Sequence, residues 1–178
     1  WFLTLGTLGL FSIAHEPAVL RALGPWHAVR FFDDNPILGF FALGAAVLVN
    51  HTDVADEEQV VAMFRAIDGH FGRLDVLVNN AGIAGGYGTL DTVGATMLAG
   101  LWAVNVTGPF VCAREAAARM ATDRGGRGGS IVNVSSRAAV LGGSGEWVHY
   151  AASKGAIDTM TVGLAKELAT VGIRVNAV

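Results

Sequence analysis

The sequence predicts an α/β protein built on a doubly wound parallel sheet, and three observations carry that prediction. Short, continuously apolar runs alternate with helical periodicity between residues 53 and 178. The runs at residues 74–78 and 131–134 are followed by Asn79 and Ser135, which are typical of the turns after strands. Strands that are apolar on both faces are typical of a parallel sheet with helices on either side.

The expected elements alternate along this part of the chain. Asp53 or Asp56 caps a first helix, because a side-chain carboxylate accepts the free N–H groups of a first helical turn. The helical stretch that follows the first strand is expected to break near Gly94 and Gly108. We expect strands over residues 74–78, 131–134 and 173–178, with helical stretches over residues 91–123 and 149–170 between them.

Residues 1–49 have a different composition, rich in Phe, Leu and Gly. Two apolar runs, residues 1–14 and 37–49, are each shorter than the roughly 18–20 residues of a membrane-spanning helix. We expect an apolar, helical N-terminal segment, and divide the chain into residues 1–50, foreign to the α/β fold, and residues 51–178.

Charge and cysteine content narrow the class of protein. The net charge of −3 comes from 12 basic and 15 acidic residues without a basic stripe, so no nucleic-acid partner is predicted. The single Cys112 permits no internal disulfide and no cysteine metal cluster, and we expect it to be a small core residue. No signal peptide is recognisable, and we expect a cytoplasmic protein, with membrane association through residues 1–49 as the alternative.

Tyr150 and Lys154 stand four residues apart in a predicted helix. Positions i and i+4 share a helix face, so the phenol and the ammonium can point into one pocket. A nearby cation favours the phenolate form of a tyrosine and makes it a usable acid/base group near neutral pH. Such a pair also arises on ordinary helices, so it indicates a catalytic site only when other motifs accompany it in the sequence.

Six motifs follow one another along the chain: Asp53-Val54, Asn79-Asn80-Ala81-Gly82, Asn105, Ser135-Ser136, Tyr150-x-x-x-Lys154 and residues 173–176. With these motifs in this order, residues 52–178 resemble the short-chain dehydrogenase/reductases. The tract 145–158 is most similar to bacterial sugar or glucose dehydrogenase-like members. The resemblance implies an incomplete Rossmann-like sheet and an oxidoreductase that interconverts an alcohol and a carbonyl with NAD or NADP.

The resemblance also assigns catalytic roles. Tyr150 would be the general acid/base, and Lys154 would favour its phenolate and bind the nicotinamide ribose. Ser136 would orient the substrate oxygen; we prefer it to Ser135 because it matches the second serine of the family motif. Asn105 would hold a water that connects Lys154 to solvent, although it also suits a buried polar residue at a helix break.

The resemblance places Asn79, Ala81 and Gly82 along the cofactor, with Asp53 and Val54 beside its adenine. The alternatives are a strand-ending turn for residues 79–82 and a simple helix cap for Asp53. Three neighbours of Tyr150 are also of interest. His149 points about 100° away from it and is expected to be structural or at the substrate rim, while Trp147 and Val148 are expected to form a substrate wall.

Part of the family pattern is missing. No Thr-Gly-x-x-x-Gly-x-Gly loop is present, and the run from Gly6 to Leu10 neither matches it nor follows a recognisable strand. The strand at residues 74–78 should then have an exposed edge, and we hypothesise that residues 45–50 fill the vacant place beside it.

Residues 1–49 resemble instead the Kup family of bacterial potassium transporters, through residues 1–6, 15–25, 28–32 and 39–48. A potassium-transporter fragment and an inactive chimeric remnant are therefore the alternative readings. The dehydrogenase resemblance implies a small-molecule alcohol or carbonyl substrate. It also implies a homotetramer, built partly on the helices at residues 91–123 and 149–170.

Overall fold

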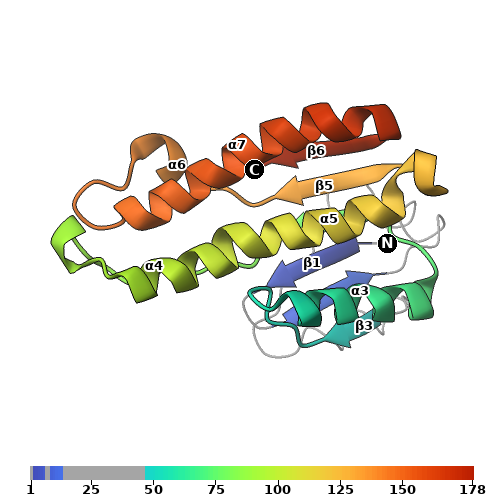
Figure 1. Cartoon of the computed structure of the whole chain (residues 1–178), viewed down its shortest axis with the longest axis horizontal. Helices are drawn as coiled ribbons and strands as arrows, with labels where there is room; N and C mark the ends of the chain where they lie inside the picture. Colours follow the sequence, from blue (N-terminus) through green and yellow to red (C-terminus); the bar gives the residue numbers. More distant parts are fainter. Residues whose placement is uncertain (1, 7–8, 14–46) are drawn as a thin grey trace, which may run out of the picture.

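The computed structural model describes residues 2–6, 9–13 and 47–178, which form a sheet of six strands under a layer of helices (Figure 1). The strand order is β3-β2-β1-β4-β5-β6. Strands β1, β4, β5 and β6 run parallel, whereas β2 is antiparallel to both of its neighbours. The strands are β1 (Phe2–Gly6), β2 (Gly9–Ile13), β3 (Val47–Asn50), β4 (Val76–Asn79), β5 (Gly129–Asn133) and β6 (Ile173–Ala177).

The main helices α3, α5 and α7 lie side by side across one face of the sheet (Figure 1). The helical elements are α3 (Glu57–Phe71), η1 (Leu90–Thr92), α4 (Ala95–Trp102), the π-helical turn η2 (Ala103–Thr107), α5 (Gly108–Met120), η3 (Thr122–Arg124), α6 (Ala138–Leu141), α7 (Val148–Leu168) and η4 (Ala169–Val171). The three strands predicted beyond residue 70 are confirmed as β4, β5 and β6.

Burial alternates along the parallel strands, although their sequences are continuously apolar. Leu77 of β4 and Ile131 of β5 are fully buried, whereas Val76 and Val132 beside them are only partly buried. Successive side chains of a strand point to opposite faces, so this alternation follows from helices on one face of the sheet. Within the described residues, helices therefore cover one face of the sheet, whereas the sequence predicted helices on both faces.

The N-terminal apolar run forms a β-hairpin, so the expectation of a helix there is wrong. Strand β1 pairs in parallel with β4, from Phe2 opposite Val76 to Thr4 opposite Val78. An unpaired strand edge exposes a row of backbone N–H and C=O groups, and β1 satisfies those of β4. The predicted exposed edge at residues 74–78 is thus covered.

The hypothesis that residues 45–50 fill the place beside β4 is also corrected. Residues 47–50 do form a strand, β3, but it pairs with β2, from Val47 opposite Ile13 to Asn50 opposite Leu10. Most of the Kup-like region, residues 14–46, lies outside the described residues.

Gly6 does follow a strand, contrary to the prediction, yet no helix begins there. Strand β2 starts at Gly9 and returns antiparallel to β1, with Gly6 opposite Gly9. Among the described residues, β1 is thus followed by an antiparallel strand and not by the helix N-terminus that receives a pyrophosphate in Rossmann folds.

Helix α3 begins at Asp56, not at Asp53. The Asp56 carboxylate accepts the N–H groups of Glu58 and Gln59 at 3.0 and 3.2 Å. Asp53 lies one turn earlier, where its Oδ1 accepts the N–H of Ala55 at 2.9 Å. The helix ends at Gly72, whose φ of 71° is left-handed and suits glycine.

The expected break near Gly108 is a π-helical turn, so the helix continues from Ala95 to Met120. Pro109 has no N–H to donate to the preceding turn, and the wider η2 turn accommodates that loss. This stretch is long and apolar enough to cross a membrane by length and composition alone. Its buried side chains, Val111, Cys112, Ala116 and Met120 among them, instead belong to the core over the sheet.

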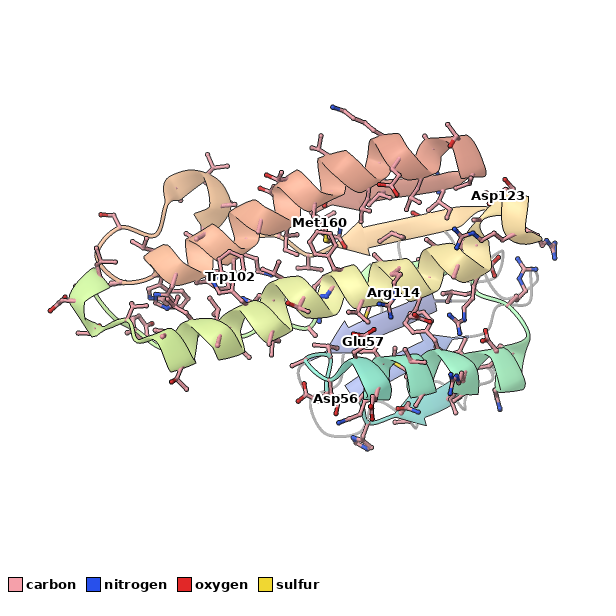
Figure 2. The ribbon with its side chains drawn as sticks, in the orientation of Figure 1. Asp56, Glu57, Trp102, Arg114, Asp123 and Met160 are labelled. Atoms are coloured by element: carbon pink, nitrogen blue, oxygen red, sulfur yellow. The ribbon has the colours of Figure 1, made fainter. Side chains whose placement is uncertain are left out.

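Ion pairs join α5 to α3 on the outer surface. Arg114 contacts Glu57 at 2.8 Å, and the two side chains reach toward each other between the helices (Figure 2). Arg119 donates to both carboxylate oxygens of Asp68 and lies over the ring of Phe64, 5.0 Å from its centroid. Exposed pairs contribute little to stability, so the bidentate and half-buried Arg119 is the stronger link.

Cys112 should be chemically inert in the folded protein. Its side chain is fully buried, and burial, assisted by Glu115, raises the pKa of the thiol to about 12. At pH 8 about one thiol in ten thousand is then ionised, and the thiolate is the reactive form. We expect no measurable reaction with a disulfide reagent in native buffer and one full equivalent in urea; rapid native labelling would contradict this core packing.

Candidate active site

Tyr150 and Lys154 lie on the first turns of α7, beside the carboxyl end of β5. The Lys154 side chain is only 5% exposed, and its Nζ donates a hydrogen bond to the carbonyl oxygen of Val134 at 2.7 Å. The same Nζ lies 5.7 Å from the centroid of the half-buried Tyr150 ring. The structure therefore brings a buried cation next to a phenol at the edge of the sheet where parallel strands end.

Burial lowers the pKa of Lys154, while the negative charge of Asp158 acts in the opposite direction. Removal from water disfavours the charged form of an amine, which explains the sign. Asp158 stands four residues further along α7, on the same side of the helix as Lys154. Burial has the larger effect, so the pKa of Lys154 lies below its ordinary value.

Asn105 lies in the π-helical turn η2 and clamps the segment after β4. Its Oδ1 accepts the N–H of Ile83 and its Nδ2 donates to the carbonyl of Ile83, both at 2.8 Å. The Nδ2 also donates to Ser153 Oγ at 3.0 Å. These bonds occupy the side chain with protein partners, as suits a buried polar residue at a helix irregularity.

Ser153 is a site residue that the sequence reasoning missed. Its hydroxyl donates to the carbonyl oxygen of Tyr150 at 2.7 Å and accepts from Asn105. It thus connects the η2 turn to the first turn of α7. The available signal was its position three residues after Tyr150 and next to Lys154, on the face of the helix that carries the pair.

The two candidate serines differ in their surroundings. Ser136 Oγ accepts the N–H of Ala138 at 3.1 Å, at the start of α6. Ser135 Oγ is buried and finds no hydrogen-bond partner in the described part of the chain, while its N–H donates to Val178. Ser136 is thus held as a local turn residue, and both serines follow β5, close to the Val134 carbonyl that binds Lys154.

A buried chain of polar side chains crosses the sheet below the site. Asn79 donates to Asn133 Oδ1 at 2.9 Å, and Asn133 donates to Thr161 Oγ1 at 2.9 Å. Thr161 in turn donates to the carbonyl of Ile157 at 2.8 Å. Asn79 also reaches the carbonyl of Pro109 at 3.4 Å, so the chain joins β4 and β5 to α5 and α7.

The predicted cofactor residues fall into two groups. Val54, Asn79 and Ala81 are buried and surround, with Pro109, a gap too small for a water molecule. Gly82 instead lies near Asn105 and Lys154: a Cβ added there would lie 3.5 Å from Asn105 Oδ1 and 3.6 Å from Lys154 Nζ, which are ordinary contact distances.

Three neighbours of Tyr150 carry aromatic or imidazole rings. Trp147 lies edge-to-face with Tyr150, at 5.6 Å between centroids, and with Tyr87 at 4.9 Å. His149 is buried, and its Nε2 lies 3.1 Å from the carbonyl oxygen of Gly86. This contact shows His149 in a structural role, holding the segment after β4 against α7.

The described residues fit a nicotinamide dinucleotide at one end only. Tyr150 and Lys154, with Gly82 beside them, supply hydrogen-bonding groups of the kind that a nicotinamide ribose requires. At the pyrophosphate end, β1 is followed by β2 and not by a helix. No group of three His, Cys, Asp or Glu side chains that could hold a metal ion occurs within residues 2–6, 9–13 and 47–178.

Four parallel strands with a Tyr–Lys pair at their carboxyl edge define a Rossmann-like fold, and comparison with known proteins identifies the family. The family profile described as short chain dehydrogenase matches residues 40–178, and the chain belongs to that family. The match begins within the apolar run at residues 37–49, before residue 52, where the resemblance was recognised from the sequence.

The chain is 55% identical over 135 residues to the uncharacterized oxidoreductase YgfF of Escherichia coli (strain K12), covering 76% of this chain and 55% of that protein. Among solved structures, ElxO with NADP bound matches with a TM-score of 0.65 at 38% identity, over 72% of this chain and 50% of its own. NAD+-bound xylitol dehydrogenase matches with a TM-score of 0.66 at 35% identity, over 72% of this chain and 48% of its own. The chain therefore spans about half the length of its relatives.

Lys154 should make the stability of the protein depend on alkaline pH. The folded lysine releases its proton below the ordinary pKa of 10.5, so between the folded pKa and 10.5 the unfolded chain binds more protons. The free energy of unfolding then rises with pH through that window. We expect the stability of wild type relative to Lys154→Met to increase across this range in urea titrations.

A stability difference between wild type and Lys154→Met that stays flat over this range would mean that Lys154 is not desolvated as the structure shows.

Proposed function

We propose that this chain carries the catalytic half of an NAD(P)-dependent oxidoreductase that interconverts an alcohol and a carbonyl. One observation carries the proposal: the buried Lys154 ammonium lies 5.7 Å from the Tyr150 ring, at the carboxyl edge of a parallel sheet. A positioned phenol with an adjacent cation meets the requirement for a general acid/base.

In the reductive direction Tyr150 donates its phenolic proton to the carbonyl oxygen as that oxygen gains negative charge. Lys154 stabilises the phenolate that remains, because opposite charges attract strongly at a partly buried site. Ser136 orients the substrate oxygen through its hydroxyl. When bound, a nicotinamide dinucleotide supplies or accepts the hydride.

Asn105 and Ser153 keep this machinery in place. Through Ile83 and the Tyr150 carbonyl, they fix the segment after β4 relative to the first turn of α7. Catalytic groups need positions fixed to about half an ångström, which such buried hydrogen bonds provide. The finer assignment to a sugar dehydrogenase-like subtype stays a prediction from residues 145–158.

The alternative is an inactive remnant, and the hairpin at the N-terminus favours it. Without a helix after β1, the pyrophosphate loses a favourable anion site. The solved relatives with bound NADP and NAD+ favour the enzyme instead. Titration of the purified chain with NADH and NADPH, followed by fluorescence, separates the two: micromolar affinity supports the enzyme, and no binding supports the remnant.

Tyr150→Phe should lower turnover of any accepted alcohol by about 10²–10⁴-fold, because general acid/base groups contribute that much. Nucleotide affinity should change little, since the phenyl ring and Lys154 remain. Stopped-assay kinetics and a nucleotide titration measure the two effects. Unchanged turnover would refute Tyr150 as the acid/base.

Substitution of the serines tests the proposed role of Ser136 in orienting the substrate oxygen. Ser136→Ala should reduce kcat, whereas Ser144→Ala, at an exposed loop position, should not. Loss of activity in Ser135→Ala but not in Ser136→Ala would transfer the role to Ser135.

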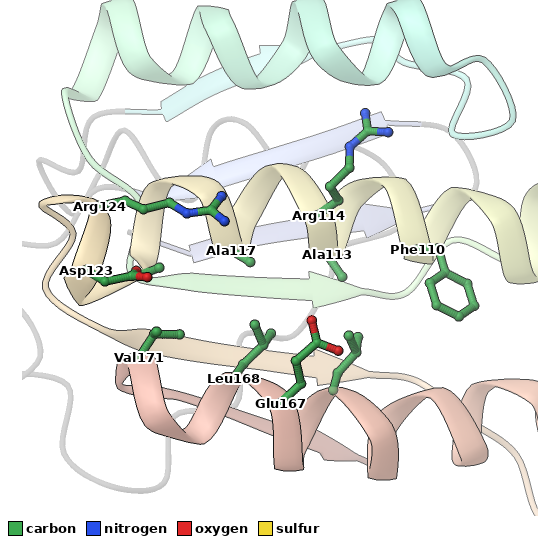
Figure 3. A pocket seen from close by; sticks show the side chains of 11 residues that line it. Phe110, Ala113, Arg114, Ala117, Asp123, Arg124, Glu167, Leu168 and Val171 are labelled. Carbon is green, nitrogen blue, oxygen red and sulfur yellow. The ribbon is translucent and has the colours of Figure 1, made fainter.

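The chain should also self-associate through α5 and α7. A groove of about 340 Å³ runs between these helices, with Ala113 and Ala117 of α5 facing Leu168 of α7 and Val171 just beyond it (Figure 3). Small side chains on one helix let a neighbouring molecule approach closely. Phe110, Ala113, Arg114, Ala117, Ala121, Asp123, Arg124, Leu164, Glu167, Leu168 and Val171 line the groove.

Ala117→Glu places a larger, charged side chain in this groove and should shift the molecular mass in sedimentation toward the monomer. Ala62→Glu, at an exposed position of α3, is the matched control and should leave the mass unchanged. A monomeric wild-type chain would overturn the assignment of this surface.

A further inference from the structure

Three aromatic rings form a row that begins at Tyr150. The Trp147 ring lies 5.6 Å from the Tyr150 ring, with an angle of 85° between their planes. The Tyr87 ring lies 4.9 Å from Trp147 at 81°. Both contacts are edge-to-face, a favoured geometry for aromatic pairs. The row leads from the half-buried phenol of the site to Tyr87, which is 78% exposed.

Backbone contacts hold Tyr87 in this exposed position. Gly85 and Gly86 have φ angles of 77° and 88°, which side chains other than glycine rarely adopt. The Gly86 carbonyl contacts His149 Nε2 at 3.1 Å. On the other side of Tyr87, the N–H of Gly88 donates to the carbonyl of Glu146 at 3.0 Å. The segment is therefore anchored on both sides of Tyr87 to the residues that flank Trp147.

The segments around the row expose large apolar side chains. They follow β4 and β5 or begin α7, so they lie toward the carboxyl edge of the sheet, and α6 lies beside the first turns of α7 (Figure 1). Large exposed apolar side chains near a candidate site are available to contact a bound molecule. They are Ile83 (40% exposed), Leu90 (82%), Val140 (87%), Leu141 (69%) and Val148 (48%).

Ring surface of this kind suits an aryl group better than a sugar. A sugar needs several side-chain donors and acceptors around it, because hydroxyl groups that lose water without gaining partners are costly. An aryl group gains from each added edge or face contact, by roughly two- to twelvefold in affinity per ring pair. The indole N–H of Trp147 is buried and finds no acceptor among the described residues.

We infer that Tyr87 and Trp147 select substrates that carry an aryl group a few bonds from the reacting oxygen. The oxygen lies at Tyr150, and the aryl group extends along the row toward Tyr87. This inference rests on the proposed function, which supplies the reacting group. It makes Tyr87 and Trp147 specificity-determining residues without a part in the proton transfer.

The test compares 4-phenyl-2-butanone with 2-butanone, since both have the same reacting ketone and only the first has a ring. For wild type, kcat/KM with NADH or NADPH should be at least about tenfold higher for the aryl ketone. Tyr87→Ala and Trp147→Leu should each reduce this preference about threefold or more, mainly through KM. Tyr87→Phe keeps the ring and should keep the preference.

His70→Ala is the matched control, because His70 also makes an exposed edge-to-face contact, with Phe71 at 4.4 Å on α3. It should leave both ketones unaffected. Equal turnover of the two ketones by wild type, or equal losses for both in Tyr87→Ala, would overturn the inference while leaving the oxidoreductase intact.

If the chain turns over no ketone, the proposed function is contradicted. Binding measurements then test the aryl preference of Tyr87 and Trp147 separately. Saturation-transfer NMR with 4-phenyl-2-butanol should detect binding to wild type and Tyr87→Phe that weakens in Tyr87→Ala. Absence of binding, or equal binding to all three proteins, would overturn the inference.

Discussion

The hydrogen bond from the buried Lys154 ammonium to the Val134 carbonyl is the contact on which the site depends. It ties the first turns of α7 to the end of β5 and brings a cation beside Tyr150. A buried charge persists only where it is paired or hydrogen-bonded, so this bond permits both the position of Lys154 and its proximity to the phenol. Gly82 borders the same ammonium group, since a Cβ added there would lie 3.6 Å from Lys154 Nζ.

The second constraint is the polar chain of Asn79, Asn133 and Thr161 inside an otherwise apolar layer. Buried amides must find partners, and these partners lie on different strands and helices. A shift in the register of β4, β5 or α7 would break these hydrogen bonds. These three polar side chains therefore help to set the register that brings Lys154 to Val134, although none of them contacts Tyr150 or Lys154.

Much of the fold beyond residue 53 was predictable, because its signals are local. The strands β4, β5 and β6 are short apolar runs, and α3 and α7 follow helical periodicity. Predictions for residues 1–50 were weaker because apolar composition alone does not distinguish a helix from a strand. The hairpin of β1 and β2 exists through pairing with β4, a contact between residues more than seventy positions apart in the sequence.

By itself the sequence determined that Tyr150 and Lys154 share one helix face, because positions four residues apart on a helix do so whatever surrounds them. The tertiary structure decided which groups surround these two side chains. It engaged Asn105 with Ile83 and Ser153, placed Trp147 between two tyrosine rings, and put a hairpin where a nucleotide-binding helix was missing. These outcomes depend on packing and strand pairing between distant segments, which local spacing does not encode.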